Sequence, residues 1–134
     1  KDNFLVANAD TWLSGGLQAV IDAGPCSIGA KKVCDVGRYG ELDIKDGNVE
    51  AFDEKLGGSR SGWINVGIYH LNADIFAKYK LGESFSLEKT VLPDIVKSRQ
   101  IRVVKLEADF IDIGVPKDYL TFCDWVKKGR VNEI

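Results

Sequence analysis

The chain has 134 residues, of which 45% are hydrophobic and 28% charged, and its formal net charge is −2. This length and apolar content exclude a disordered chain and predict one globular domain with a substantial core. The slightly acidic balance, with no basic run longer than two residues, argues against nucleic acid or an anionic membrane as a partner.

The sequence has no apolar run long enough to span a bilayer and no signal peptide at its first residue, so we expect a cytoplasmic protein with no part in a membrane. Its three cysteines, Cys26, Cys34 and Cys123, are scattered and form no CxxC pair, and His70 is its one histidine. This composition weighs against a zinc site and predicts reduced, buried cysteines. His70 lies within an apolar stretch, which favours a hydrogen-bonded structural histidine over a catalytic base.

The first half of the chain alternates apolar strands with one helix and one hairpin. Residues 4–7, FLVA, form a continuous apolar run, which is typical of a strand covered on both faces and suggests that more protein precedes it. Asp46-Gly47 is a strong turn signal between two alternating segments. The predicted elements are a strand at 4–7, a helix at 16–23, a strand at 26–36 and a hairpin with arms at 41–44 and 48–52.

The second half continues this alternation. Residues 56–62, LGGSRSG, have the composition of a mobile loop. Asn72 is placed to cap a short helix, Pro93 predicts a kink or break within a longer one, and Pro116 is placed to open the last helix. The predicted elements are a strand at 63–71, helices at 73–79 and 87–98, strands at 101–106 and 109–113, and a helix from 116 that ends before residue 129.

This order of elements predicts an α/β fold, a Rossmann-like mixed sheet with flanking helices and an inserted β-hairpin, spanning residues 1–134 as a single domain. Ligands of such sheets bind beyond the carboxyl ends of strands. Asp10 follows the first apolar strand and Asp112 lies near the end of the last one, so we expect the two carboxylates to lie close together at one edge of the sheet. The plainer alternatives are a helix cap for Asp10 and a turn residue for Asp112.

Four segments carry familiar motifs in a familiar order. They are FLVANADTWL at 4–13, FDEK at 52–55, INVGIYHL at 64–71 and DFIDIGVPKDY at 109–119. These segments resemble the N-G-D-T, E-K-P, N-x-G-x-Y and D-I-G-T-P-x-D-Y motifs of the sugar-phosphate nucleotidylyltransferase family, from one end of the chain to the other. The most similar branch of that family makes GDP-activated heptose or mannose-type sugars.

The resemblance implies an enzyme that joins a sugar 1-phosphate to a nucleoside monophosphate taken from a nucleoside triphosphate, with release of pyrophosphate. A heptose- or mannose-type sugar and GTP are the implied substrates. It also implies Mg²⁺ held by Asp10 and Asp112, because this ion takes oxygen ligands. The implied catalytic residues are Asp10, Lys55 and Asp112, with Lys55 holding the sugar phosphate, and the implied substrate-binding residues are Gly40, Glu54, Lys55, Asn65 and Gly67.

Several of these residues also have plainer interpretations. Glu54 and Lys55 would otherwise form a solvated pair at the end of a hairpin. Asn65, a polar residue within an apolar strand, would otherwise be a hydrogen-bonded core amide. Asp109 precedes Asp112 by three positions and therefore points to the other face of its strand, where we expect a structural or solvated role.

The sequence departs from the family pattern in two ways. The glycine-rich G-G-x-G-T-R-L loop after the family's first strand is not in this sequence, and Ala9 and Leu56 stand where a glycine and a proline are usual. We therefore expect this chain to be the C-terminal sugar- and metal-binding part of the domain, with an upstream segment or a second copy covering its first strand. By itself it should not catalyse nucleotidyl transfer. The alternative function is a non-catalytic sugar-nucleotide-binding or regulatory module of the same fold.

Overall fold

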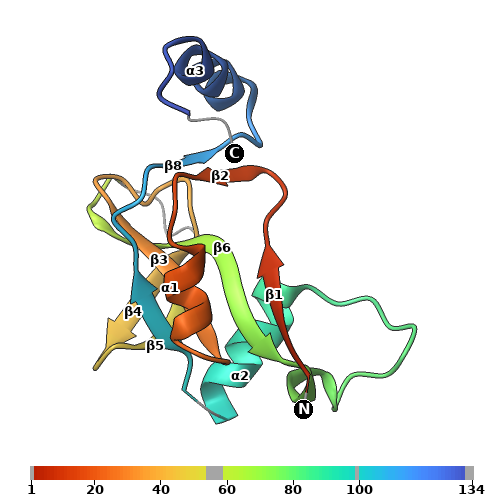
Figure 1. The fold of residues 1–134 in the computed structure, drawn as a ribbon. Helices are drawn as coiled ribbons and strands as arrows, with labels where there is room; N and C mark the ends of the chain where they lie inside the picture. Colours follow the sequence, from red (N-terminus) through yellow and green to blue (C-terminus); the bar gives the residue numbers. More distant parts are fainter. Residues whose placement is uncertain (1, 54–58, 99, 132–134) are drawn as a thin grey trace.

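The structure is a computed structural model in which residues 2–53, 59–98 and 100–131 are described. A six-stranded sheet with helices on both faces lies below a separate two-stranded sheet (Figure 1). The elements are β1 (Asn3–Ala7), β2 (Thr11–Leu13), α1 (Leu17–Asp22), β3 (Ser27–Val33), β4 (Glu41–Lys45), β5 (Asn48–Asp53), β6 (Gly62–Asn72), the 3-10 helix η1 (Ala73–Phe76), the π-helical turn η2 (Leu87–Val91), α2 (Leu92–Ser98), β7 (Arg102–Lys105), β8 (Phe110–Asp112) and α3 (Pro116–Lys127). The expected α/β class, mixed sheet and hairpin are confirmed.

The eleven-residue strand β6 is the spine of the main sheet. β3 and β1 both run antiparallel to β6, and β7 runs parallel to β3. The hairpin β4–β5 joins β7 through the pair Asn48–Arg102 and returns to β6 through the pair Glu41–Ile64. The pairings therefore close on themselves through β6, β3, β7, β5 and β4, while β1 is attached outside this ring.

The alternation of side chains along β3 places α1 and α2 on opposite faces of the sheet. Ile28 and Ala30 are completely buried in the main hydrophobic cluster, which includes Leu92 and Ile95 of α2. Gly29 faces the other way, and a Cβ atom added to it would lie 3.6 Å from Val20 of α1. The core is therefore built on both faces of the sheet.

Two turn signals act as the sequence predicts. Asp46 and Gly47 have φ angles of 50° and 79°, the pair of left-handed conformations that a tight two-residue hairpin requires. Pro93 lies in the first turn of α2, directly after the π-helical turn η2. Proline lacks the N–H that would bond to the preceding turn, and its ring clashes with the carbonyl group there. The wider π turn removes that conflict, so the predicted break occurs before Pro93.

β6 contains a bulge whose centre is Gly67. One residue of β3, Gly29, faces three residues of β6, because Ile28 pairs with Tyr69 and Ala30 pairs with Asn65. Gly67 adopts a φ of 75°, and a Cβ atom there would lie 2.5 Å from the Asn8 side chain. The bulge therefore lets the chain after β1 lie directly against β6, where the N–H of Asn8 donates to the carbonyl of Gly67 at 2.9 Å.

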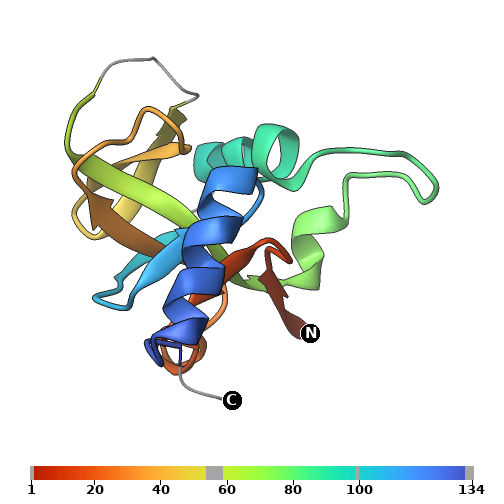
Figure 2. The same ribbon diagram turned by 90° about the horizontal axis from the view of Figure 1, so that it is seen from above.

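Apolar surface remains open around β1 and α3. The side chains on one face of β1 are exposed, with Leu5 at 43%, so the expected cover on both faces of this strand is not found there. Within the described residues β1 pairs with β6 alone and so lies at the edge of the sheet. In α3, Tyr119, Leu120 and Val126 are all at least half exposed. Figure 1 shows α3 beyond the two-stranded sheet, and in Figure 2 it crosses over the strands.

The three cysteines are not buried as expected. Cys34 is exposed, and Cys26 and Cys123 are half-buried. Cys34 lies just beyond the end of β3, and Cys26 lies in the turn before that strand with a φ of 62°. Among the described residues, no helix combines the length and the apolar character that crossing a bilayer would require.

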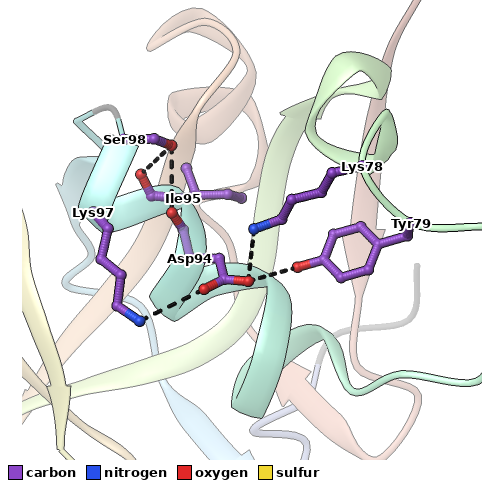
Figure 3. Close-up of polar contacts among 6 residues, drawn as sticks. All are labelled: Lys78, Tyr79, Asp94, Ile95, Lys97 and Ser98. Atoms are coloured by element: carbon purple, nitrogen blue, oxygen red, sulfur yellow. Dashed lines mark hydrogen bonds and ion pairs between the residues drawn. The ribbon is translucent and has the colours of Figure 1, made fainter.

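Asp94 ties α2 to the segment that follows η1 (Figure 3). Its Oδ2 accepts hydrogen bonds from Lys78 Nζ at 2.7 Å and from Tyr79 Oη at 3.0 Å, and Lys97 Nζ lies 3.6 Å from Oδ1. The hydrogen bond from Lys78, followed by the one from Tyr79, lowers the pKa of the Asp94 carboxyl. This carboxylate therefore stabilises the junction only while it is ionised.

We predict that Gly67→Ala destabilises the protein by about 1–3 kcal/mol, because alanine disfavours this backbone conformation and its methyl group would clash with Asn8. Gly24→Ala is the matched control, since Gly24 has a φ of 82° with no atom within 4 Å of an added Cβ. Urea unfolding should give a larger loss for Gly67→Ala, and adding Asn8→Ala should recover part of it. Equal losses at the two glycines would show that the close contact has no energetic role.

We predict that Asp94→Asn lowers the melting temperature at neutral pH and that this difference shrinks in acid. A carboxyl group whose folded pKa is lowered stabilises the fold above its unfolded pKa of about 4 and loses that contribution as the pH falls through the folded pKa. Melting curves of both proteins between pH 7 and pH 2 test this. Asp124→Asn is the control, because Asp124 of α3 pairs with Lys128, the residue directly after that helix, and so joins no separate elements. A pH-independent difference for Asp94→Asn would contradict the prediction.

Candidate functional site

The short sheet β2–β8 brings Asp10 and Asp112 together. Its strands are antiparallel, and Thr11, which follows Asp10, pairs with Asp112. The N–H of Ile113 donates to the carbonyl of Asp10 at 2.8 Å. Backbone pairing therefore places these two aspartates side by side, as expected, although they are 102 positions apart in the sequence.

The two carboxylates converge on a gap beside Gly114. A Cβ atom on Gly114 would lie 3.0 Å from Asp112 Oδ1 and 3.1 Å from Asp10 Oδ2, so the two oxygens are at most roughly 6 Å apart. The N–H of Gly114 donates to Asp112 Oδ1 at 2.8 Å and holds it in this orientation. A side chain at this position would fill the gap, which glycine leaves open.

This donor set suits a hard divalent cation. Mg²⁺ binds through one or two carboxylates and keeps its other positions for water and phosphate oxygens. Among the described residues neither Asp10 nor Asp112 forms an ion pair, and no cluster of three or more side chains of the histidine, cysteine, aspartate and glutamate types is found. The two oxygens beside Gly114 therefore fit Mg²⁺ better than an ion that needs a complete set of protein ligands.

Asp109 lies apart from this pair. Its carboxylate accepts from Arg130 Nε at 3.1 Å, and its N–H donates to Ser14 Oγ at 2.8 Å. The Arg130 guanidinium also lies 4.0 Å from the ring centre of Trp125. Asp109 thus fastens the end of α3 to β8, which is the structural role that its position in the sequence predicts.

The side chain of Asn65 is hydrogen-bonded inside the protein. Its Oδ1 accepts from the N–H of Gly67 at 2.9 Å, and its Nδ2 donates to Tyr69 Oη at 2.6 Å. Tyr69 Oη in turn donates to Glu88 Oε1 at 2.9 Å, and burial raises the pKa of the Tyr69 hydroxyl. This network matches the core-amide alternative for Asn65, and it includes Tyr69 and Glu88, which sequence reasoning did not select.

Gly40 lies next to Asn65, because its carbonyl accepts from the backbone N–H of Asn65 at 3.2 Å. The structure thereby brings together three of the expected substrate-binding residues, Gly40, Asn65 and Gly67. Glu54 and Lys55, the other two, lie outside the described residues, as do residues 56–58 of the expected loop. The neighbour of Gly40, Tyr39, packs its ring edge-on against Phe110 of β8 at 5.5 Å.

A cavity of 640 Å³ lies beside the carboxylate pair, between β1, the bulge of β6 and the segment that includes β2. Its lining includes Asn8, Thr11, Trp12, Gly67 and Arg130, but not Asp10 or Asp112. The cavity thus touches the site through Thr11 and Gly67 without containing the carboxylates. The facing oxygens of Asp10 and Asp112, rather than this cavity, define the candidate site, because carboxylate oxygens are the ligands that suit a divalent cation.

His70 is remote from this chemistry. It pairs in register with Leu5 of β1 and Ser27 of β3, and within the described ranges its buried Nδ1 has no hydrogen-bond partner. The expectation of a fully hydrogen-bonded histidine is therefore wrong for this atom. Its neighbours across the sheet are the aliphatic Leu5 and Ser27, whose hydroxyl donates to the Val20 and Gly24 carbonyls.

Comparisons with known proteins show which family the chain belongs to. The family model described as nucleotidyl transferase matches residues 1–128. The D-glycero-alpha-D-manno-heptose 1-phosphate guanylyltransferase of Campylobacter jejuni is 35% identical over 124 residues, covering 91% of this chain and 55% of that protein. A probable mannose-1-phosphate guanylyltransferase of Arabidopsis thaliana is 32% identical over 125 residues, covering 88% of this chain and 34% of that protein.

The solved structures place the whole arrangement in one fold. HddC from Yersinia pseudotuberculosis superimposes with a TM-score of 0.78 at 35% identity, covering 92% of this chain and 55% of that one. An apo UDP-glucose pyrophosphorylase, at 19% identity and a TM-score of 0.73, shares the fold. The chain thus spans about half the length of HddC and of the Campylobacter relative. By sequence and by structure, this chain belongs to the nucleotidyl transferase family.

Proposed function

We propose that this chain is the sugar- and metal-binding part of a sugar-1-phosphate guanylyltransferase. The observation that carries the proposal is the pair of facing carboxylates, Asp10 and Asp112, around the gap that Gly114 leaves open. The names of the relatives support a heptose- or mannose-type sugar 1-phosphate as one substrate. The HddC structure complexed with GMP-PN supports a guanine nucleotide as the other.

In the proposed reaction an oxygen of the sugar 1-phosphate attacks the α-phosphorus of GTP. The bond from that phosphorus to the bridging oxygen of pyrophosphate breaks, and pyrophosphate leaves. Such transfers depend on in-line positioning and on cancelling charge, with little covalent help from the protein. Bound Mg²⁺ would neutralise phosphate charge between the two anionic reactants. Asp10 and Asp112 would hold that ion, oriented by the backbone of Ile113 and Gly114.

The remaining assignments concern the sugar. Lys55 would hold its phosphate as a point charge, and Glu54 would accept hydrogen bonds from its hydroxyls. Gly40 and Gly67, which have no side chains, would let the protein backbone approach the sugar ring. Asn65 would be held between them by its hydrogen bonds to Gly67 and Tyr69. Glu88 joins these candidates, because it is exposed and its carboxylate lies on this network.

The nucleotide-binding part would lie outside this chain, whose sequence contains no G-G-x-G-T-R-L loop. An upstream segment or a second copy would cover β1, where Leu5 is exposed. The substrates of this reaction are phosphorylated metabolites, which supports a cytoplasmic location.

We predict that Asp112→Asn weakens binding of Mn²⁺, a spectroscopic substitute for Mg²⁺, by roughly tenfold or more, because one of two charged ligands is lost. Asp109→Asn is the matched control, since Asp109 lies on the same strand segment but pairs with Arg130. Electron paramagnetic resonance titration of the three proteins measures the affinities. Equal losses in both variants would count against the metal assignment.

We predict that Gly114→Ala also weakens Mn²⁺ binding, because the added methyl group would occupy the gap between the carboxylates. Gly15→Ala is the control, since no atom lies within 4 Å of a Cβ there. The melting temperatures of both variants should be compared first, to exclude global unfolding. Unchanged affinity in a folded Gly114→Ala protein would show that the cation does not bind in this gap.

Turnover separates an enzyme from a binding module. We predict that residues 1–134 alone release no pyrophosphate from GTP and mannose or heptose 1-phosphate. A chimera in which residues 1–128 replace the equivalent part of HddC should release pyrophosphate, and Asp112→Asn should abolish this activity. An inactive chimera that is folded and binds both substrates would favour the non-catalytic module.

A further inference from the structure

The turn that contains Arg38 and Tyr39 lies over the same face of β8 as Asp112. Tyr39 packs against Phe110, and Phe110 and Asp112 point to the same side of the strand because they are two positions apart. The guanidinium of Arg38 lies 5.6 Å from the Tyr39 ring centre. The hydrogen bond to Asp118 raises the pKa of Arg38, and the charge of Asp112 acts from farther away in the same direction.

Arg38 nevertheless pairs with a different carboxylate. Its Nη2 contacts Oδ2 of Asp118, in the first turn of α3, and the Asp118 side chain is only 14% exposed. Asp10 and Asp112 have no ion pair in the described part of the chain. Arg38 therefore lies over the face of β8 that carries Asp112, but its guanidinium pairs with Asp118, six residues farther along the chain and beyond Gly114.

We propose that Asp118 is a positioning residue that holds Arg38 away from the Asp10–Asp112 pair and so keeps the pair open to a divalent cation. This inference rests on the proposed function, in which the pair binds that cation. A guanidinium can donate to two carboxylate oxygens at once, which makes Arg38 a direct competitor for the same oxygens. Releasing Arg38 would therefore block the cation site from within the protein.

A second effect must be separated from this one. Removing the charge of Asp118 weakens the attraction of any nearby cation, whether or not Arg38 moves. That general effect would have the same size with or without Arg38. Competition by Arg38 requires Arg38, so the two effects differ in a double-mutant cycle.

The experiment is a Mn²⁺ titration of the unaltered chain, Asp118→Asn, Arg38→Met and the double variant. We expect Asp118→Asn to weaken Mn²⁺ binding about tenfold, within the coupling range for contacting residues. The double variant should bind Mn²⁺ as Arg38→Met does. Loss by the same factor in both backgrounds, or no loss, would overturn the proposal. The matched control is the cycle of Asp109→Asn and Arg130→Met, a similar pair on the same segment, which should leave affinity unchanged.

A crystal structure of Asp118→Asn tests the movement separately. We expect the Arg38 guanidinium to contact Asp112 or Asp10 in that variant, and Arg38 extended into solvent would overturn the positioning role. If the unaltered chain binds no Mn²⁺ at millimolar concentration while Arg38 moves as expected, the proposed metal site fails and the competition for the carboxylates remains. If the chain binds Mn²⁺ and Arg38 does not move, the metal site remains and the role of Asp118 fails.

Discussion

The candidate site depends on the pairing of two three-residue strands. β2 and β8 are too short to be stable alone, since an isolated two-stranded sheet is marginal in water. One face, with Leu13 and Phe110, packs on the smaller hydrophobic cluster around Val36, Ile64, Val66 and Leu106. Trp12, the residue before Leu13, contacts Phe122 and Trp125 of α3, and its ring centre lies 5.7 and 6.0 Å from theirs. The register that joins Asp10 to Asp112 is thus held from both sides, by the smaller hydrophobic cluster and by α3.

Two glycines, Gly67 and Gly114, let neighbouring groups of the candidate site lie close together. Gly67 bends β6 so that Asn8 lies against it, and this contact directs the chain from β1 toward Asp10. Gly114 leaves space between the carboxylates and orients Asp112 through its N–H. One glycine is needed for its backbone conformation and the other for its missing side chain. Both occur in motifs that the sequence displays, INVGIY and DIGVP, but only the coordinates separate the two reasons.

Local signals in the sequence predicted the elements well, because their causes are local. The Asp-Gly turn, the break at Pro93 and the start of α3 at Pro116 follow from the backbone chemistry of single residues. The proximity of Asp10 and Asp112 was predicted from strand ends meeting at one edge of an α/β sheet. The structure brings them together by another route, the antiparallel pairing of β2 and β8 in a separate two-stranded sheet. The partners of Asn65 and Arg38 were not predictable, since Glu88 and Asp118 lie 23 and 80 positions away and reach them only through the tertiary fold. The exposure of Tyr119, Leu120 and Val126 in α3 was not predictable either, because the sequence of a helix does not reveal whether another element covers its apolar residues.

Two ionised carboxylates that face each other across a gap repel each other, which opposes their close approach in the folded state. The backbone hydrogen bonds of Ile113 and Gly114 and the packing around β2 and β8 hold the pair in place against that repulsion. A divalent cation would relieve the repulsion in the folded state and have no comparable site in the unfolded chain, so its binding would also stabilise the fold. An arginine placed between the carboxylates would give the same relief permanently, and would leave no room for the ion. In the proposed arrangement, the pairing of Arg38 with Asp118 keeps the arginine charge within the protein and leaves the gap between Asp10 and Asp112 open to the ion.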